Sequence, residues 1–277
     1  MITPRAASDK TSRADDRSTR LNKTAIVAID VGNMSIALGG WEAMTVVGSA
    51  HLPTSDRQQF PAALTRLCTR FPDSKPQAVV LASVVPDAVG WIRDCVASVA
   101  EVRALVVGSE IPLPIPVAVR EPDRVGVDRV CAAAAAFDRT GHACTVVDFG
   151  SAVTVDLVDD RGTFVGGAIL PGPALQARIL AEGTAALPEI GLAPPEQSIG
   201  RDTVEAIRSG IYNGIAGAVR GLVEQYATVL NTWPQVVATG GDLEALLPRC
   251  DFIDNAIPDL ALMGVGLAYA RHRDATR

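Results

Sequence analysis

The sequence has little of what marks a zinc-binding, nucleic-acid-binding or membrane-spanning protein. Its five cysteines form no Cys-x-x-Cys pair, and its three histidines, His51, His142 and His272, lie far apart, so nothing indicates a zinc site. The net charge of -6 argues against a nucleic-acid groove, which needs a basic face. No run of residues approaches the ~18 apolar positions that a membrane helix requires.

A secretory signal is also missing, because residues 1–22 are polar and charged and predict a disordered tail. The odd number of cysteines and the missing signal predict reduced thiols in a cytoplasmic protein. Aromatic residues make up only 4% of the chain and hydrophobic residues 48%, so small aliphatic side chains must fill the core. With 277 residues, the chain is long enough for two domains of ordinary size.

Two segments repeat one design, AIVAIDVGN at 25–33 and TVVDFGS at 145–151. In each, a β-branched apolar run leads through an aspartate, Asp30 or Asp148, into a glycine turn, and a second strand follows. Such a turn holds a carboxylate at a fixed point and leaves backbone N–H groups able to face an anion. Two units of this kind could hold a nucleoside triphosphate and its metal ion. Each Asp-x-Gly could also simply end a strand.

The rest of the pattern predicts the order strand, hairpin, helix, strand twice over, which is typical of an α/β protein with two similar halves. The first hairpin is expected to turn around Gly39-Gly40. The apolar spacing at 203–230 predicts a long helix that carries four glycines. Glycine costs a helix up to ~1 kcal/mol relative to alanine, so this series favours close packing against another helix, although an exposed face could tolerate it. The four are Gly210, Gly214, Gly217 and Gly221.

Seven short motifs then follow one another along the chain: 30–33 (DVGN), 82–86 (ASVVP), 126–129 (GVDR), 148–154 (DFGSAVT), 166–172 (GGAILPG), 199–203 (IGRDT) with Ser209-Gly210, and 238–241 (ATGG). Over about residues 24–272 their order and spacing resemble the type III pantothenate kinases, in the actin-like, sugar-kinase-like ATPase superfamily. The resemblance implies an α/β fold of two similar actin-like (ribonuclease H-like) halves, 23–140 and 141–277, with an ATP cleft between them.

The resemblance also implies an activity: ATP-dependent phosphorylation of pantothenate to 4'-phosphopantothenate, the first step of coenzyme A biosynthesis. The family uses Mg²⁺ and a monovalent cation, K⁺ or NH₄⁺, and works as a homodimer. Asp128 would be the catalytic base that accepts the proton of the substrate hydroxyl. Gly126, Val127, Asp128 and Arg129 would bind pantothenate, with Arg129 available to its carboxylate, and Thr203 would reach the substrate of the partner subunit.

On the ATP side, the resemblance assigns the first phosphate-binding hairpin to Asp30, Val31, Gly32, Asn33, Met34, Ser35, Ile36 and Ala37. Asp30 would act on Mg²⁺, directly or through water, and Asp148 would hold the monovalent cation. Ser151 would contact an ATP phosphate, and Gly240 and Gly241 would lie against the adenosine.

The chemistry of the residues supports these roles separately. Phosphoryl transfer depends mostly on positioning and charge neutralisation. Asp128 and Arg129 begin an alanine-rich helix, whose N-terminus favours anions. By themselves they could equally be a helix cap and a solvated arginine.

Four positions depart from the family, two of them mildly: Ser151 stands for threonine and Val127 for alanine. The other two departures are larger. Met34 stands where the family has threonine, and Val119 stands where it has a tyrosine that contacts the substrate. Each lost hydrogen bond would cost ~0.5–1.5 kcal/mol and would weaken the hold on ATP or substrate. The alternatives are a non-catalytic, nucleotide-binding regulatory relative and a kinase for another small hydroxy acid. Retention of Asp30, Asp128, Arg129 and Asp148 favours an enzyme.

Overall fold

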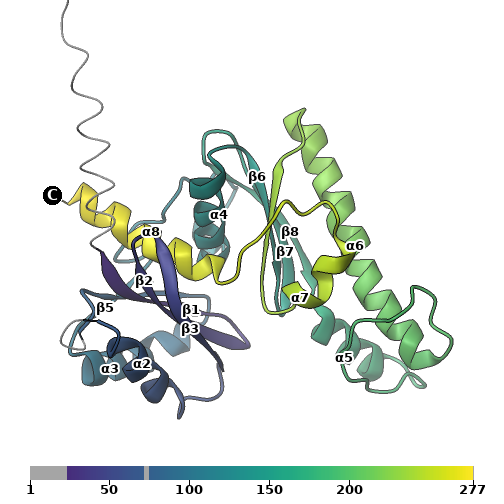
Figure 1. Cartoon of the computed structure of the whole chain (residues 1–277), viewed down its shortest axis with the longest axis horizontal. Helices are drawn as coiled ribbons and strands as arrows, with labels where there is room; N and C mark the ends of the chain where they lie inside the picture. Colours follow the sequence, from purple (N-terminus) through teal and green to yellow (C-terminus); the bar gives the residue numbers. More distant parts are fainter. Residues whose placement is uncertain (1–23, 72–74, 277) are drawn as a thin grey trace, which may run out of the picture. The chain divides into compact units, whose positions relative to one another are not determined.

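The computed structural model describes residues 24–71 and 75–276, so the predicted disordered tail at 1–22 lies outside the described residues. The chain forms two compact units (Figure 1). One comprises the described residues up to 112 together with 265–276, and the other comprises 113–264. The expected division of the chain into actin-like halves near residue 140 stays a prediction.

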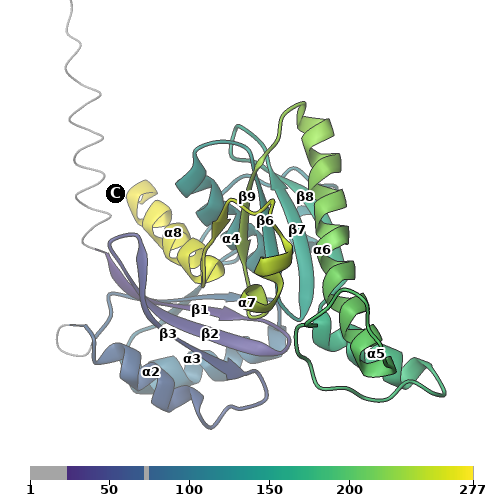
Figure 2. The ribbon, with the colours of Figure 1, turned by 45° about the vertical axis from the view of Figure 1, so that its right-hand side comes forward.

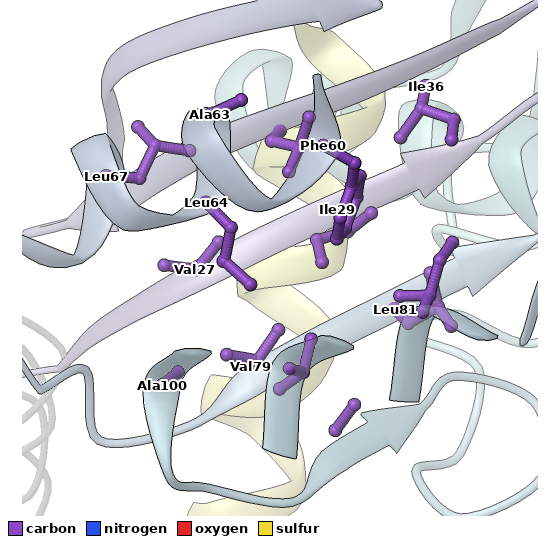
Figure 3. Packing of buried hydrophobic residues seen from close by; sticks show 14 of the residues in the cluster. Val27, Ile29, Ile36, Phe60, Ala63, Leu64, Leu67, Val79, Leu81 and Ala100 are labelled. Carbon is purple, nitrogen blue, oxygen red and sulfur yellow. The ribbon is translucent and has the colours of Figure 1, made fainter. Parts of the chain in front are cut away.

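The first unit is built on a five-stranded sheet of order β3-β2-β1-β4-β5. An antiparallel meander of β1 (Ala25–Val31), β2 (Ser35–Glu42) and β3 (Thr45–Pro53) continues into β4 (Val79–Ser83) and β5 (Ala104–Val106), which run parallel to β1. Helices α2 (Phe60–Cys68) and α3 (Pro86–Ala100) form the apolar core of the unit together with β1, β2 and β4. Figure 3 shows Phe60 and Leu64 of α2 directed at Val27 and Ile29 of β1.

The second unit has a sheet of order β10-β9-β6-β7-β8, the same arrangement read from the other edge. Again three antiparallel strands, β6 (Cys144–Phe149), β7 (Ala152–Val158) and β8 (Phe164–Pro171), precede two that run parallel to the first, β9 (Gln235–Thr239) and β10 (Asn255–Ala256). This repetition confirms the predicted α/β fold with two similar halves. Figure 2 shows the long helix α6 (Thr203–Leu230) beside β7 and β8, and apolar residues of α6 contribute to the core of this unit.

The helices of the second unit precede β6 or lie between its strands in the sequence. They are α4 (Val127–Thr140), α5 (Pro173–Gly183), α6 (Thr203–Leu230) and α7 (Leu243–Leu246), with short 3₁₀ turns at Pro122–Arg124 and Leu247–Arg249. The sequence gives no expectation of α5, because Pro171-Gly172-Pro173 there suggests only a turn. Pro173 in fact takes the first position of the helix, where proline is tolerated. The last helix, α8 (Leu260–Ala275), ends the described chain.

The prediction that the first hairpin turns at Gly39-Gly40 is wrong. The chain reverses at Ala43 and Met44, which adopt φ values of 48° and 66°, and not at Gly39-Gly40. Two successive residues with positive φ are typical of the turns that match the twist of a hairpin. Gly39 and Gly40 instead lie within β2 at a register shift against β3.

Helix α6 has the bounds that the apolar spacing predicts. The Asp202 side chain caps its first turn by accepting the backbone N–H of Glu205 at 2.8 Å, and Asn231 ends the helix with φ of 56°. Ile207, Ile211 and Ile215 are buried within the unit. In the part of the chain that the structure describes, no helix has the length and apolar character needed to cross a membrane.

Candidate active site

Asp148 lies one residue before the end of β6, at the carboxyl edge of the second sheet. Its neighbours Val147 and Phe149 are buried, and the carboxylate is largely removed from water. Burial, and then the negative charges of Asp128 and Asp156, raise the pKa of Asp148 from 3.8 to about 7. These three aspartates therefore form one electrostatic cluster within the second unit. Two of them, Asp128 and Asp148, are site residues predicted from the sequence.

Glycine turns pack directly against this cluster. Gly240 has φ of 106°, and a Cβ atom there would lie 2.5 Å from Asp148 Oδ1 and 2.4 Å from the Phe149 carbonyl oxygen. The backbone N–H of Asp242 donates to that same carbonyl at 2.8 Å. The structure thus brings the motif at 238–241 against the motif at 148–154. Gly241 has open space around it, and Ser151 is exposed beside the tight turn at Gly150.

Asp128 lies in the first turn of α4, directly after the start of the helix, which follows Gly126. Its Oδ1 accepts the backbone N–H of Arg129 at 2.8 Å. Burial raises the pKa of Asp128, while that hydrogen bond and the charge of Arg129 oppose the rise. A poorly hydrated carboxylate is a stronger proton acceptor than one in water, which suits a general base.

Arg129 is held by Asp156, a residue that the sequence analysis missed. Arg129 Nε lies 3.1 Å from both carboxylate oxygens of Asp156, and Nη2 pairs with Oδ1. The Asp156 side chain is only 2% exposed and the Arg129 side chain 17%. The guanidinium also lies over the ring of Phe164, 5.5 Å from its centroid.

A signal for Asp156 does exist in the sequence. It is the one charged residue within the run 152–158, whose other members are apolar except for Thr154, and a charge in a buried strand needs a partner. Nothing local could identify that partner, because Arg129 is 27 positions away.

Val119, the position where the family has tyrosine, lies beside β8. The backbone N–H of Ala118 donates to the carbonyl of Phe164 at 2.8 Å, so the segment before Val119 pairs with the edge of the sheet. A Cβ atom on Gly166 would lie 3.6 Å from Val119 Cγ1. Val119 therefore lies against β8 at Gly166, two residues after Phe164, whose ring packs on Arg129.

The other predicted phosphate-binding residues belong to the first unit. Asp30, in β1, is followed by a tight turn in which the N–H of Gly32 donates to the carbonyl of Ser35 at 2.9 Å. Thr54 holds this turn from the end of β3: its hydroxyl donates to the Gly32 carbonyl at 2.8 Å and its N–H to the Met34 carbonyl at 3.0 Å. The Met34 residue is 64% exposed.

The predicted substrate contact at the start of α6 is exposed, whereas its neighbours have structural roles. Thr203 is the first residue of the helix and is exposed. Gly200 packs so closely on the first turn that an added Cβ would lie 2.2 Å from the backbone nitrogen of Ala206. Ser209 is buried, donates to the Ser198 carbonyl at 2.5 Å and accepts from Asn213 at 3.0 Å.

Within residues 24–71 and 75–276, no group of three or more His, Cys, Asp or Glu side chains is placed to hold a metal ion. A cation at Asp30 or Asp148 would thus have at most two such side chains among these residues as ligands. Such sparse protein ligation is usual for Mg²⁺ in phosphoryl-transfer sites, where the substrate phosphates supply ligands.

The fold has the two-sheet design of the actin-like ATPases and sugar kinases. An activator of 2-hydroxyisocaproyl-CoA dehydratase from Clostridium difficile with bound ADPNP matches with a TM-score of 0.54 at 14% identity, covering 91% of this chain and 97% of that one. A ROK family glucokinase from Streptomyces griseus in complex with glucose and AMPPNP gives 0.51 at 12% identity, covering 90% and 99%. At such identities the likeness concerns the fold alone.

The sequence defines the family within that class. The family model of the type III pantothenate kinases matches residues 26–225. The type III pantothenate kinase of Dehalococcoides mccartyi is 34% identical over 249 residues, which cover 88% of this chain and 96% of that protein. The chain therefore belongs to the type III pantothenate kinase family and is a phosphotransferase, which supports the kinase interpretation over a non-catalytic relative.

Proposed function

We propose that this type III pantothenate kinase transfers the γ-phosphoryl group of ATP to the primary hydroxyl of pantothenate with Asp128 as the general base. The family to which the chain belongs carries out this first step of coenzyme A biosynthesis. The observation that supports the base is the Asp128 carboxylate, which lies partly buried in the first turn of α4 and has a pKa that burial raises against the opposing charge of Arg129. Asp128 would take the hydroxyl proton as the oxygen attacks phosphorus.

Arg129 is the proposed partner of the substrate carboxylate. Its guanidinium is fixed by Asp156 and Phe164, so little side-chain entropy remains to be lost on binding. Gly126 and Val127 would contribute backbone to the same substrate site. Because pantothenate carries its carboxylate at the end opposite to the reacting hydroxyl, this contact would bind the substrate without taking part in the chemistry.

ATP would be contacted by the glycine turns of both repeats. In the first unit these are the residues from Asp30 to Ala37, and in the second they are Ser151, Gly240 and Gly241. The open space at Gly241 leaves room for a ligand beside the backbone, which is consistent with an adenosine contact.

The cation sites are part of the proposal. Asp148 fits a monovalent cation, because a desolvated carboxylate next to two other carboxylates is stabilised by a positive charge. Asp30 would act on Mg²⁺, directly or through water. When bound, these cations supply the charge neutralisation that phosphoryl transfer needs.

We further propose that the protein is a homodimer with α6 at the interface. Gly210, Gly214 and Gly217 are exposed, and a Cβ atom added at any of them, or at Gly221, would meet nothing within 4 Å in this chain. They recur at intervals of three and four, so they lie along one face of the helix. A partner helix could approach this face closely, and Thr203 of each chain would then serve the substrate site of the other.

The test is a coupled kinase assay with the purified protein, ATP and Mg²⁺, with and without K⁺. We expect phosphorylation of pantothenate that K⁺ stimulates in the wild-type protein. Asp128→Asn keeps the size of the side chain but removes the proton acceptor, so this variant should lose the phosphorylation activity. Absence of turnover with pantothenate, together with normal ATP binding, would show that the acceptor is a different molecule.

A further inference from the structure

We propose that Asp156 is a positioning residue for substrate recognition: it orients the guanidinium of Arg129 so that its Nη1 edge meets the carboxylate of the acceptor. The inference rests on the proposed role of Arg129 in binding that carboxylate. It assigns a function to a residue that does not itself touch the substrate.

The pairing geometry defines which edge of the guanidinium Asp156 takes up. The Asp156 carboxylate accepts from Nε and from Nη2, and its contacts do not include Nη1. A guanidinium has two edges suited to bidentate pairing with a carboxylate, the Nε–Nη2 edge and the Nη1–Nη2 edge. With the first edge occupied, the second is the one left for a substrate carboxylate.

The surroundings fix both groups. Phe164 packs against the face of the guanidinium at 5.5 Å, so Arg129 is held at one edge and on one face. Gly167 pairs with Asp156 across the β7–β8 ladder, and a Cβ atom there would lie 2.4 Å from Asp156 Oδ1. The absence of a side chain at Gly167 is thus what makes room for the carboxylate.

A purely structural ion pair is the competing explanation, and the position of the pair argues against it. The pair lies in the same electrostatic cluster as Asp128, the proposed base, because the charges of Asp128 and Asp156 both act on Asp148. Arg129 also keeps 17% of its side chain exposed while Asp156 is at 2%, so the pair presents its cationic partner to solvent.

The experiment compares two acceptors, pantothenate and its alcohol analogue pantothenol, in which CH₂OH replaces the carboxylate. For each variant, kcat, KM and the equilibrium dissociation constant are measured with both acceptors. In Asp156→Asn we expect the preference for pantothenate over pantothenol to fall by about 10- to 100-fold, the range for a misplaced hydrogen bond to a charged group. The fall should appear in KM and in the dissociation constant for pantothenate, with kcat and all constants for pantothenol nearly unchanged.

A matched control is available in the same unit. Arg220 pairs with Asp251 and lies 4.8 Å over the ring of Phe252, so it has the same two kinds of contact, but the side chains are 43% and 83% exposed. Asp251→Asn should leave the acceptor preference intact. Equal losses with both acceptors in Asp156→Asn would overturn the positioning role, because damage to the fold does not depend on the carboxylate of the substrate.

A second comparison covers the case in which Asp156→Asn does not fold. Arg129→Gln removes the cation and leaves the Asp156 carboxylate buried without its partner, whereas the double variant Arg129→Gln with Asp156→Asn is neutral at both positions. If Asp156 acts through Arg129, the two variants discriminate equally poorly between the acceptors. A further change in preference in the double variant contradicts the proposal. A wild-type protein that phosphorylates both acceptors without preference contradicts it as well, whereas one that phosphorylates neither refutes the proposed function itself.

Discussion

Removal of the Asp148 charge should change the pH dependence of stability in a specific way. Asp148 is held in a desolvated position near Asp128 and Asp156, and these surroundings raise its pKa to about 7 in the folded protein. In the unfolded chain the group returns to its ordinary pKa near 3.8. Asp148→Asn removes this titration and keeps the shape of the side chain.

The sign follows from the two pKa values. Below pH ~4 the carboxyl is protonated in both states, and its contribution to stability is fully present. Between pH ~4 and ~7 the unfolded state ionises while the folded state stays protonated, so that contribution is progressively lost. The difference between 3.8 and about 7, at about 1.4 kcal/mol for each pH unit, amounts to on the order of 4 kcal/mol.

The assay is urea unfolding of both proteins from pH 4 to pH 8.5, without nucleotide and without K⁺ or NH₄⁺. The free energy of unfolding of Asp148→Asn, minus that of the wild type, should rise with pH and become constant above about pH 7. Asp251→Asn, which changes an exposed carboxylate, should give a flat difference. A flat difference for Asp148→Asn would refute the argument that burial and neighbouring charge hold this group in an unfavourable ionised state.

Cation addition extends the same prediction. If Asp148 binds K⁺, the salt should stabilise the wild type at pH 8 by about 2.7 kcal/mol at 100 times the dissociation constant. The effect should weaken below pH 7, because the protonated carboxyl competes with the cation, and it should be absent in Asp148→Asn. Equal stabilisation of both proteins would place the cation elsewhere.

Three further outcomes are expected. Asp128→Asn should lower kcat by about 10²- to 10⁴-fold with little change in ATP affinity by calorimetry, and near-normal turnover would exclude Asp128 as the base. Met34→Thr should lower the KM for ATP, and Val119→Tyr should lower the KM for pantothenate. Because both changes restore neutral contacts, kcat should hardly change. Unchanged KM values would show that these positions do not touch the ligands. Gly214→Ala should weaken the proposed dimer in sedimentation experiments. Gly90→Ala, in an equally open helical position of α3, should raise stability by up to ~1 kcal/mol and leave assembly unchanged. A dimer unaffected by Gly214→Ala would move the interface away from α6.

Much of the fold could be predicted because its signals are local. The spacing of apolar residues defines α6 from Thr203 to Leu230, and the β-branched runs define β1, β6 and β9. The repeated order of strands then follows from the repeated order of patterns. The hairpin turn could not be placed in this way, because neither Ala43 nor Met44 is a residue type that favours turns. Both adopt positive φ because the register of the two strands requires it.

The candidate site shows the same division. Asp128 and Asp148 could be proposed from the sequence because each lies in a motif of consecutive residues, and their roles stay predictions. Asp156 and Thr54 could not, since their meaning depends on partners far away in sequence: Arg129 for the first, and Gly32 and Met34 for the second. A sequence motif identifies residues whose side chains can bind or react, but only the fold shows which other residues position those side chains.

The glycines carry this reasoning one step further, because their surroundings are of two kinds. At Gly167 and Gly240 an added Cβ would strike a carboxylate oxygen and a backbone oxygen of the same chain, so the fold itself requires glycine there. At Gly241 and along the exposed face of α6, as at Gly214, an added Cβ would meet nothing. Helical glycine without such a need only lowers stability. The closely packed glycines therefore shape the site within the chain. The open glycines have a physical reason only if something outside the chain comes close to the backbone, which would be a ligand at Gly241 or a partner helix at Gly214.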